Sequence, residues 1–472
     1  MKRIAFFLII VFAASLAPLD ARVAPEPARE FRAAWITPVQ GYDWPRPGAG
    51  EAAQKAELTR LLDLAKAAHL NAVILHVRTS ADALYPTKRA PWSAYLTGTQ
   101  GKSPGYDPLA FALREAHARG LELHAWFNPF RATEAPRKTK LAASHITRRH
   151  PGWIVRYGSE TWINPGIPAA RAAVLATIFE VVERYDIDGV HLDDYFYPYR
   201  EDGAGEFNDP RSWKKYGKAA GFKTAYDWRR DNVNKFIKAL YAGVHQRKPY
   251  LAVGISPFGI WKSGVPTGVT GLDAYSEIYA DARLWLQKGW LDYLAPQLYW
   301  PLDGVQSRFT RLDEWWLNQN VKRRYIWPGL GTLLAARWQP GEIRRQIDTV
   351  RQARSTTAAG HVHFHLTNVL AQGPLYSEFA LVPAMPWLSR KVPSAVHVER
   401  RASVGDSIAL RLTKPAGARW LLVESLDHGT WRSDLLFAKS QFRLRRAERI
   451  VVRWISRTGI AGPADVLRQP AH

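Results

Sequence analysis

The sequence contains no cysteine, and acidic residues are scarce in it. The missing thiols exclude a disulfide scaffold, a cysteine-ligated zinc or iron–sulfur site, a cysteine nucleophile and a lipoprotein anchor on cysteine. Asp and Glu number 42 against 65 Lys and Arg, which gives a net charge of +23 over 472 residues. This excess predicts an acidic partner, but by itself it does not choose between nucleic acid, a membrane surface and an acidic polymer.

Long apolar runs are also missing, apart from one at the N-terminus. Lys2 and Arg3 precede an apolar run over residues 4–16, which small residues and Pro18 follow. This pattern is typical of a secretory signal peptide, and the run is shorter than the roughly 18 residues of a membrane span. We therefore expect residues 1–21 to be a signal peptide and the protein to be exported, to the periplasm or the extracellular space, without a membrane span. Export makes nucleic acid an unlikely partner.

The composition is otherwise that of a folded protein. With 47% hydrophobic residues, the chain can bury a core, which excludes a disordered or fibrous protein. The length predicts two to three domains, or one large α/β barrel with an appendage. The 20 Trp residues indicate either flat ligands stacked on rings or bulky core filling.

Short apolar runs alternate with helical patterns over residues 31–388. In one helical stretch Leu58, Leu61, Leu62 and Ala65 follow the i, i+3, i+4, i+7 spacing of a buried helix face. The alternation predicts a (β/α)₈ TIM barrel with long loops. A doubly wound open sheet is the alternative, which the lack of a Gly-rich phosphate loop disfavours. The runs expected as strands are residues 31–37, 71–78, 121–127, 188–193, 250–256, 292–299, 325–328 and 361–366.

The sequence pattern changes after residue 388. Residues 389–472 contain no helical pattern, and they hold 16 Lys or Arg against 7 Asp or Glu. We expect a basic all-β sandwich of the immunoglobulin or fibronectin-III type there, after a linker at residues 22–30 and the barrel at 31–388. Its expected strands are residues 407–413, 419–425, 435–439 and 450–455.

The best candidate for chemistry is the end of the fourth expected strand. In a TIM barrel, functional residues lie at the carboxyl ends of the strands, and side chains alternate between interior and helical shell. His191 and Asp193 are therefore expected to face the interior. Glycoside hydrolysis needs two carboxyl groups, or one carboxylic acid and the acetamido group of the substrate. Asp193 fits a nucleophile, base or acid, and Asp194 fits a partner that orients or polarises, unless Asp194 only caps the following loop.

A second carboxyl is harder to find. Glu277, after the fifth strand, is the further catalytic candidate, and Asp281 and Asp303 are weaker ones. Asp281 falls inside a helical pattern, which favours a structural role.

Aromatic and polar residues coincide at several other strand ends. Rings stack on the apolar face of a sugar, while amide, guanidinium and hydroxyl groups bind its hydroxyls. Any one of these residues alone is consistent with packing, and their coincidence indicates a sugar site. The expected substrate-binding residues are Trp35, Arg78, Trp126, Asn128, Arg131, His191, Tyr195, Tyr197, Ser256, Trp261, Gln297, Tyr299 and Trp300.

Two further patterns, a row of histidines and a basic segment, are weak indications of a metal site and of a nucleic-acid site. His361, His363 and His365 share one face of the eighth strand, as metal ligands can, but no carboxylate accompanies them. We therefore expect no metal and no cofactor. Residues 129–166 carry seven Lys or Arg against two Glu, and in an exported protein this segment is a basic loop over the active-site face rather than a nucleic-acid patch.

Several motifs together resemble a known family. Residues 31–35, 185–198, 227–233, 254–261 and 279–300 are similar to bacterial glycosyl-hydrolase-like family 10, in the same order along the barrel. The resemblance implies a (β/α)₈ glycosidase with Asp193 and Asp194 as its catalytic residues. The family includes envelope hydrolases that cleave denuded peptidoglycan, that is, glycan strands stripped of their stem peptides. Its members are often lipoproteins, whereas this chain has no cysteine.

The expected function is that of an exported glycoside hydrolase acting on peptidoglycan strands, in particular denuded ones. Stripping exposes the lactyl carboxylate of each muramic acid, so the strand is a polyanion that a basic protein attracts. A non-catalytic glycan-binding protein and a glycosidase for another polysaccharide are the alternatives. Either Glu277 completes a two-carboxylate reaction, or the Asp pair works with the acetamido group of the substrate. We expect the protein to be a monomer.

Overall fold

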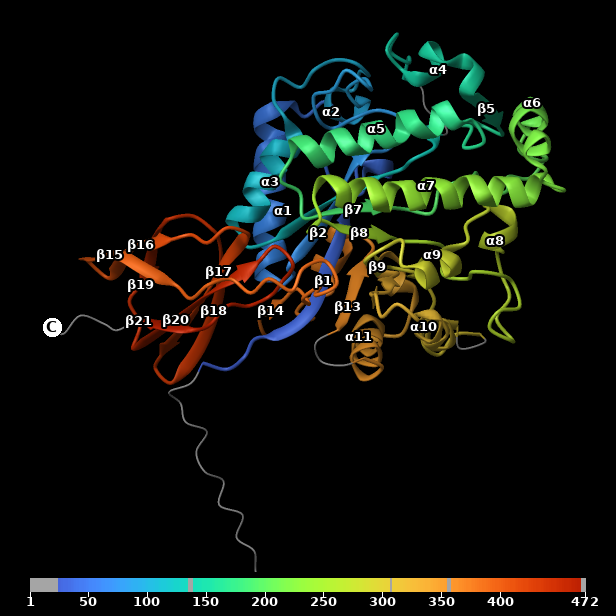
Figure 1. Ribbon diagram of the computed structural model, residues 1–472. Coiled ribbons are helices and arrows are strands. Elements are labelled where there is room, and N and C mark those ends of the chain that lie inside the picture. The colour runs from blue at the N-terminus through green and yellow to red at the C-terminus, as the bar shows by residue number, and fades with distance from the viewer. Residues whose placement is uncertain (1–23, 135–138, 306–307, 355–357, 468–472) are drawn as a thin grey trace, which may run out of the picture.

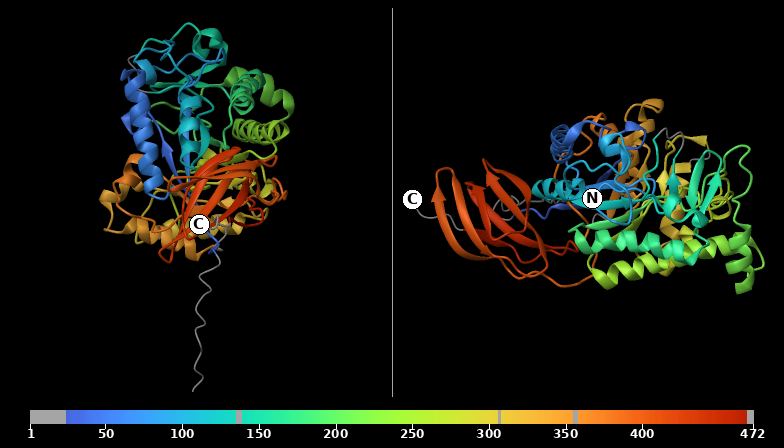
Figure 2. Two further views of the ribbon diagram at one scale, coloured as in Figure 1. Left: turned by 90° about the vertical axis from the view of Figure 1, so that its left-hand side faces the viewer. Right: turned by 90° about the horizontal axis from the view of Figure 1, so that it is seen from above.

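The computed structural model describes residues 24–134, 139–305, 308–354 and 358–467 (Figure 1). The predicted signal peptide, residues 1–21, lies outside these ranges. A barrel and a β-sandwich lie beside each other and give the molecule an elongated shape (Figure 2). Within the described ranges, no helix is both long enough and apolar enough to cross a membrane.

Parallel strands form a closed barrel, as the alternation of apolar runs predicts. β9 with β10, and β11 with β12, are successive segments of the sixth and seventh strands, separated at Pro296 and Pro328, which have no N–H to donate. β13 pairs with both β12 and β1, so the sheet closes and the open doubly wound alternative is excluded. The strands are β1 (Ala28–Ile36), β2 (Ala72–Arg78), β3 (Glu122–Phe127), β7 (Gly189–Leu192), β8 (Ala252–Ile255), β9 (Tyr293–Leu294), β10 (Gln297–Leu298), β11 (Tyr325–Ile326), β12 (Gly329–Leu330) and β13 (Ala359–His363).

Helices surround the barrel with their apolar faces turned inward. In α1 (Gly50–Ala67) the four residues with helical spacing, Leu58 to Ala65, are buried. α3 (Pro108–Ala118) begins where the side chain of Asp107 accepts a hydrogen bond from the N–H of Ala110, with Pro108 at the first helical position. The other helices are α2 (Ala94–Thr97), α4 (Ile146–Arg149), α5 (Pro168–Arg184), α6 (Pro210–Ser212), α7 (Ala225–Arg247), α8 (Ala274–Glu277), α9 (Ala282–Lys288), α10 (Arg308–Gln319), α11 (Glu342–Gln352) and α12 (Leu366–Leu370).

The basic loop that follows β3 has a structure of its own. Its strands β4 (Arg131–Thr133), β5 (Ile154–Tyr157) and β6 (Glu160–Ile163) form a small antiparallel sheet in the order β4-β6-β5. The sheet lies at the carboxyl end of the barrel strands, because β4 starts directly after β3 ends. The sheet therefore fixes charged side chains beside the expected active site.

The C-terminal part is a sandwich of two antiparallel sheets. Leu410, Phe442, Leu421, Val452 and Trp454 fill the space between the sheets. The sequence predicts four strands, β16, β17, β18 and β20, but the structure also contains β15, β19 and β21. The sheets are β15 (His397–Val404), β16 (Ser407–Thr413) and β19 (Gln441–Arg445), and β18 (Thr430–Phe437), β17 (Ala418–Asp427), β20 (Arg449–Ser456) and β21 (Asp465–Leu467).

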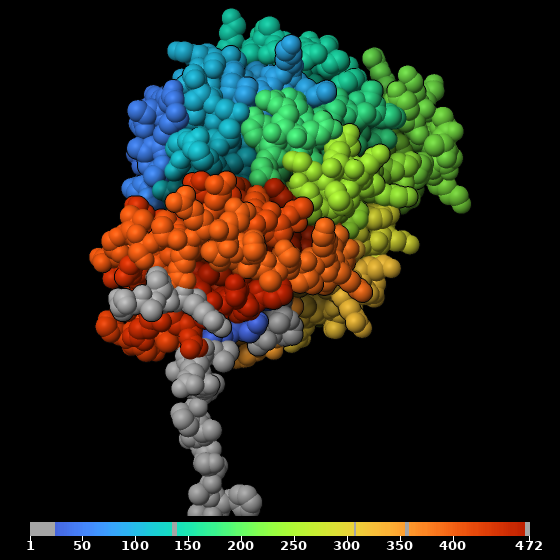
Figure 3. Space-filling model, turned by 60° about the vertical axis from the view of Figure 1, so that its left-hand side comes forward, coloured from blue at the N-terminus to red at the C-terminus, as the bar shows by residue number. Residues whose placement is uncertain are grey.

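The sandwich packs against the amino-terminal end of the barrel (Figure 3). Trp420, Leu422 and Leu435, on the outer face of the four-stranded sheet, contact Leu381 of β14 (Ala380–Leu381), which pairs with the first residues of β1. β1 thus begins at Ala28, inside the segment expected to be a linker.

A buried ion pair also joins the two domains. Arg419 donates to both Asp186 and Asp188, just before β7 begins. Asp193 follows the other end of β7, and five residues of strand span about 16 Å. The basic sandwich and the expected active site therefore lie at opposite ends of the barrel.

Candidate active site

A cavity of about 920 Å³ lies at the carboxyl end of the barrel strands. We call it the central cavity. Its wall combines aromatic rings with five charged side chains, and strands β1, β2, β3, β7, β8 and β10, or the loops after them, all contribute. Its lining includes Trp35, Tyr42, His76, Tyr95, Trp126, Arg131, Glu134, Glu160, Asp193, Asp194, Tyr195, Tyr199, Ser256, Phe258, Gln297, Tyr299 and Phe364.

Asp193 is the first residue after β7 and is only 2% exposed. Its Oδ2 accepts a hydrogen bond of 3.0 Å from the indole Nε1 of Trp126, and its Oδ1 accepts one of 3.4 Å from the backbone N–H of Tyr195. Burial and the neighbouring charge of Asp194 raise the pKa of Asp193 to about 7. A carboxyl group with this pKa can both give and take a proton near neutral pH.

Asp194 is likewise buried, at 3% exposed, and it lines the same cavity. Burial raises the pKa of Asp194 as well, but hydrogen bonds from Tyr199 and Gln297 stabilise its charged form. Two adjacent buried carboxylates disfavour double ionisation. We infer that the shared proton resides mainly on Asp193 and that Asp194 carries the charge.

Arg131, on β4, is the cation of the central cavity. Its guanidinium lies 4.4 Å from the centre of the Tyr195 ring, and its charge opposes the rise in the pKa of Asp193. Glu134 and Glu160 line the cavity beside it. Both come from the basic loop, and neither is among the expected site residues.

His191 lies beneath the cavity rather than in its wall. Its Nε2 is 3.1 Å from the indole Nε1 of Trp35 and 3.0 Å from Oγ of Ser256, and its Nδ1 is 3.0 Å from the hydroxyl of Tyr293. Because an indole N–H can only donate, Nε2 accepts and Nδ1 carries the proton. Burial lowers the pKa of His191 well below its ordinary value. This neutral ring positions Trp35 and Ser256 and is not itself a proton donor to substrate.

His76 lines the central cavity, although it is not among the expected binding residues. Its ring stacks on Trp126 with centroids 3.7 Å apart, and its Nδ1 lies 3.0 Å from Oγ1 of Thr37. The expected residue from this strand, Arg78, lines a different cavity. A register shift between His76 and Arg78 interrupts the alternation of β2, a local irregularity that strict alternation does not anticipate.

Several expected binding residues are placed in packing or turns instead of the cavity wall. Asn128 Oδ1 accepts the backbone N–H of Arg131 at 3.1 Å. Tyr197 packs between Phe207 and Tyr279. The remaining two are Trp261, which donates to Asp281 at 3.0 Å, and Trp300, whose ring meets Phe258 edge-on.

The structure does not bring Glu277 together with the Asp pair. Its carboxylate accepts the backbone N–H of Asp273 at 2.9 Å, while Asp273 accepts the N–H of Ser276 at 2.8 Å. These reciprocal bonds cap the start of α8. Asp281 caps α9 in a similar way, and the exposed Asp303 pairs with Arg345.

The three histidines of the eighth strand have partners other than a metal. His361 and His363 both approach the hydroxyl of Tyr376 with Nε2, and His365 Nδ1 lies 2.8 Å from a carboxylate oxygen of Asp43. Within the described ranges, the group of three side chains arranged to hold a metal is Asp427, His428 and Glu448, mostly exposed on the sandwich.

Sequence comparisons with known proteins agree on one family. The sequence profile described as "Glycosyl hydrolase-like 10" matches residues 30–332. The chain is 44% identical to glycosyl hydrolase YngK of Bacillus subtilis over 77% of this chain and 75% of that protein. It is 36% identical to glycosyl hydrolase DigH of Escherichia coli K12 over 61% of this chain and 70% of that protein. Among solved structures, the catalytic domain of a β-amylase from Paenibacillus polymyxa is 14% identical, with a TM-score of 0.48 over 74% of this chain and 96% of that one.

Proposed function

Because the chain belongs to the glycosyl hydrolase-like 10 family and is a glycosyl hydrolase, we propose that it is exported and cleaves peptidoglycan strands whose stem peptides have been removed. The observation that supports this proposal best is the pair Asp193 and Asp194 buried side by side in a cavity walled by aromatic rings. Such walls bind the apolar faces of sugar rings, and the pair supplies the acid that glycosidic cleavage needs.

The charge of the protein supports an acidic glycan as substrate. Each muramic acid of a peptide-free strand exposes a lactyl carboxylate. The chain carries a net charge of +23, and Arg131 places a cation inside the cavity itself. The protein as a whole attracts the polyanion, more weakly as salt screens the field, while inside the cavity Arg131 already faces the carboxylate of Glu134 at 3.8 Å.

For the mechanism, we propose catalysis with participation of the substrate. Protonated Asp193 gives its proton to the leaving glycosidic oxygen, while the acetamido oxygen of the substrate attacks the anomeric carbon. Ionised Asp194 accepts a hydrogen bond from the hydroxyl of Tyr199. It also accepts a hydrogen bond from the N–H of the substrate amide and thereby orients the acetamido group. Water then attacks the anomeric carbon and breaks its bond to the acetamido oxygen, while ionised Asp193 takes a proton from that water and returns to its starting state.

A substrate analogue separates this mechanism from a two-carboxylate reaction. A strand with a 2-hydroxyl in place of the acetamido group is expected to resist cleavage. Glu134→Gln and Glu160→Gln are expected to retain most of the activity, because neither carboxylate is needed for the step. Cleavage of the analogue at a similar rate, with loss of activity in either Glu variant, would show that a second carboxyl of the cavity wall acts as nucleophile or base.

The substrate proposal is tested by comparing three kinds of polymer under one condition. Purified protein is incubated with amidase-stripped strands, intact sacculi and a neutral glucan, and new reducing ends are counted. The expected order of turnover is stripped strands first, then sacculi, with no cleavage of the glucan. Equal or faster turnover of the neutral glucan would refute the proposal while leaving the glycosidase itself in place.

A further inference from the structure

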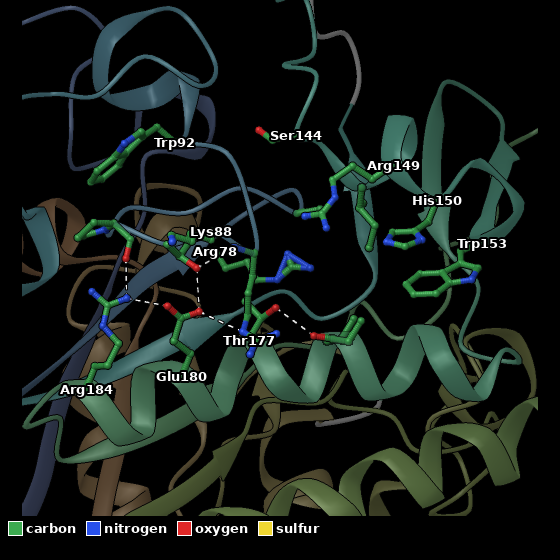
Figure 4. A pocket seen from close by; sticks show the side chains of 17 residues that line it. Arg78, Lys88, Trp92, Ser144, Arg149, His150, Trp153, Thr177, Glu180 and Arg184 are labelled. Carbon is green, nitrogen blue, oxygen red and sulfur yellow. Dashed lines mark hydrogen bonds and ion pairs between the residues drawn. The ribbon is translucent and has the colours of Figure 1, made fainter.

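A second cavity of about 990 Å³ lies on the flank of the barrel, and we call it the lateral cavity (Figure 4). It is bounded by α5 and by the segments that follow β2 and β3. Its lining includes the cationic and aromatic side chains Arg78, Lys88, Arg149, Arg184, Trp92 and Trp153.

Arg78 is the buried anchor of this cavity. The residue is 3% exposed, and its Nε and Nη1 have no hydrogen-bond partner among the described residues. The charge of Asp82 acts on the guanidinium from nearby, although burial still lowers the pKa of Arg78. A buried guanidinium with unused donors is costly, and an anion in the cavity beside Arg78 would stabilise its charge.

The other charges of the cavity are also mostly positive. Glu180 is the acidic residue of the lining, and it is bonded to Arg89 at 3.3 Å, Arg184 at 2.6 Å and Thr87 at 2.7 Å. Lys88 and Arg149 are exposed, and no described carboxylate pairs with either of them. An anion therefore meets the buried Arg78, the two exposed cations Lys88 and Arg149, which have no described carboxylate partner, and one carboxylate that is already neutralised.

Aromatic rings accompany these cations. Trp92 and Trp153 are half-buried in the lining, and the ring of His150 stacks on Trp153 with centroids 3.9 Å apart. Flat rings next to guanidinium groups suit a ligand that has both an apolar ring face and an acid group. We propose that the lateral cavity is a second glycan-binding site that takes a carboxylate-bearing sugar, with its carboxylate on Arg78.

The lateral and central cavities share two stretches of chain. In the first stretch, Trp92 lines the lateral cavity and Tyr95 lines the central one. In the second, Ser144 lines the lateral cavity and Thr139 lines the central one. On the proposal, a strand cleaved in the central cavity extends to the lateral one, and binding at both would raise its affinity. This step rests on the proposed function, because it identifies the acid sugar as muramic acid of the substrate strand.

Exposed residues allow a test that does not threaten folding. The double variant Lys88→Ala/Arg149→Ala removes two uncompensated cations, and Arg148→Ala removes the exposed neighbour of Arg149 that is not in the lining. We expect the double variant to raise KM for stripped strands on the order of tenfold, and Arg148→Ala to leave KM near the wild-type value. Melting temperatures of all three proteins confirm that the fold is intact.

Binding measured without turnover separates this proposal from the proposed function. In the Asp193→Asn background, titration calorimetry compares stripped strands with chitooligosaccharides, which lack the carboxylate. The double variant is expected to lose affinity for the strands only. Equal affinities of double variant and Arg148→Ala for the strands, or an equal loss for chitooligosaccharides, would overturn the proposal. If the wild type does not cleave strands, the proposed function fails, and the titration still decides whether the lateral cavity binds an acid sugar.

Discussion

Replacing Trp126 by phenylalanine tests whether Asp193 is the catalytic acid. The indole N–H of Trp126 donates to Asp193 at 3.0 Å, and it is one of the groups that hold the pKa of this carboxyl down against burial and Asp194. Phenylalanine keeps a ring for His76 to stack on but has no N–H. The ionised form of Asp193 then loses a stabilising hydrogen bond, so its pKa rises.

The size of the shift follows from the charged acceptor. A hydrogen bond to a charged group contributes about 1.5–3 kcal/mol, and one pKa unit corresponds to about 1.4 kcal/mol. Starting from a pKa of about 7, Trp126→Phe is expected to move the pKa of Asp193 upward by about one to two units. Protonated Asp193 is the active form, so the alkaline limb of kcat/KM moves to higher pH by the same amount.

The assay is the pH profile of kcat/KM on stripped strands, which reports the free enzyme. Trp35→Phe is the matched control, since Trp35 lines the same cavity but donates to His191 instead of Asp193. Its alkaline limb is expected to stay in place. An unmoved or downward-shifted limb in Trp126→Phe would refute the assignment of Asp193 as the acid, and so would an equal shift in both variants.

Three further outcomes follow from the same structure. The folded-state pKa of Asp193, about 7, lies above the ordinary 3.8, so this group increasingly opposes folding as pH rises from about 4 to about 7. Asp193→Asn is therefore expected to be more stable than wild type by roughly 2–4 kcal/mol in urea unfolding at pH 8, and the difference is expected to vanish near pH 4. No gain in stability at pH 8 would contradict the raised pKa. Arg419→Ala leaves Asp188 buried without its main cation, and it is expected to lower the free energy of unfolding by about 3–5 kcal/mol; a loss below 1 kcal/mol would show that the interface ion pair contributes little. Glu277→Gln keeps a cap acceptor for α8 and is expected to retain wild-type kcat, whereas a loss of more than about 100-fold, the scale of a missing acid or base, would return it to the catalytic set.

The barrel could be predicted because its strands are buried on both sides and therefore read as continuous apolar runs. All eight runs coincide with strand positions. Pro296 divides the run over residues 292–299 into β9 and β10, and the run over residues 325–328 contains β11 but ends just before β12. In the sandwich, by contrast, β15 is largely exposed and rich in arginine, so its sequence does not look like a strand. β15 is a strand because it pairs with β16, and such tertiary pairing cannot be predicted from a local sequence pattern.

The site was predictable where it follows directly from a strand end. Asp193 and Asp194 follow directly after the last residue of β7, and both line the cavity. Glu134 and Glu160 reach the same cavity through the small sheet after β3, whose fold is not visible in the spacing of the residues. Glu277 follows the fifth strand in the sequence, but its carboxylate caps α8 instead of reaching the cavity.

The structure shows where the basic residues of the chain lie relative to the central cavity. The sandwich carries much of the basic surplus, but it covers the amino-terminal end of the barrel and joins it through Arg419. The cation that lines the central cavity, Arg131, comes instead from the loop after β3, which also supplies Glu134 and Glu160. On the proposed function, an acidic strand would therefore be held by Arg131 and by the cations of the lateral cavity rather than by the sandwich.

Mass spectrometry of amidase-stripped strands incubated with wild-type protein, Asp193→Asn and Asp194→Asn tests the central claim most directly. Wild-type protein is expected to release short fragments with new reducing ends, while both variants bind the strands and leave them intact. Release of fragments by Asp193→Asn at a rate near that of wild type would contradict the account, because the buried pair would then not be the catalytic centre.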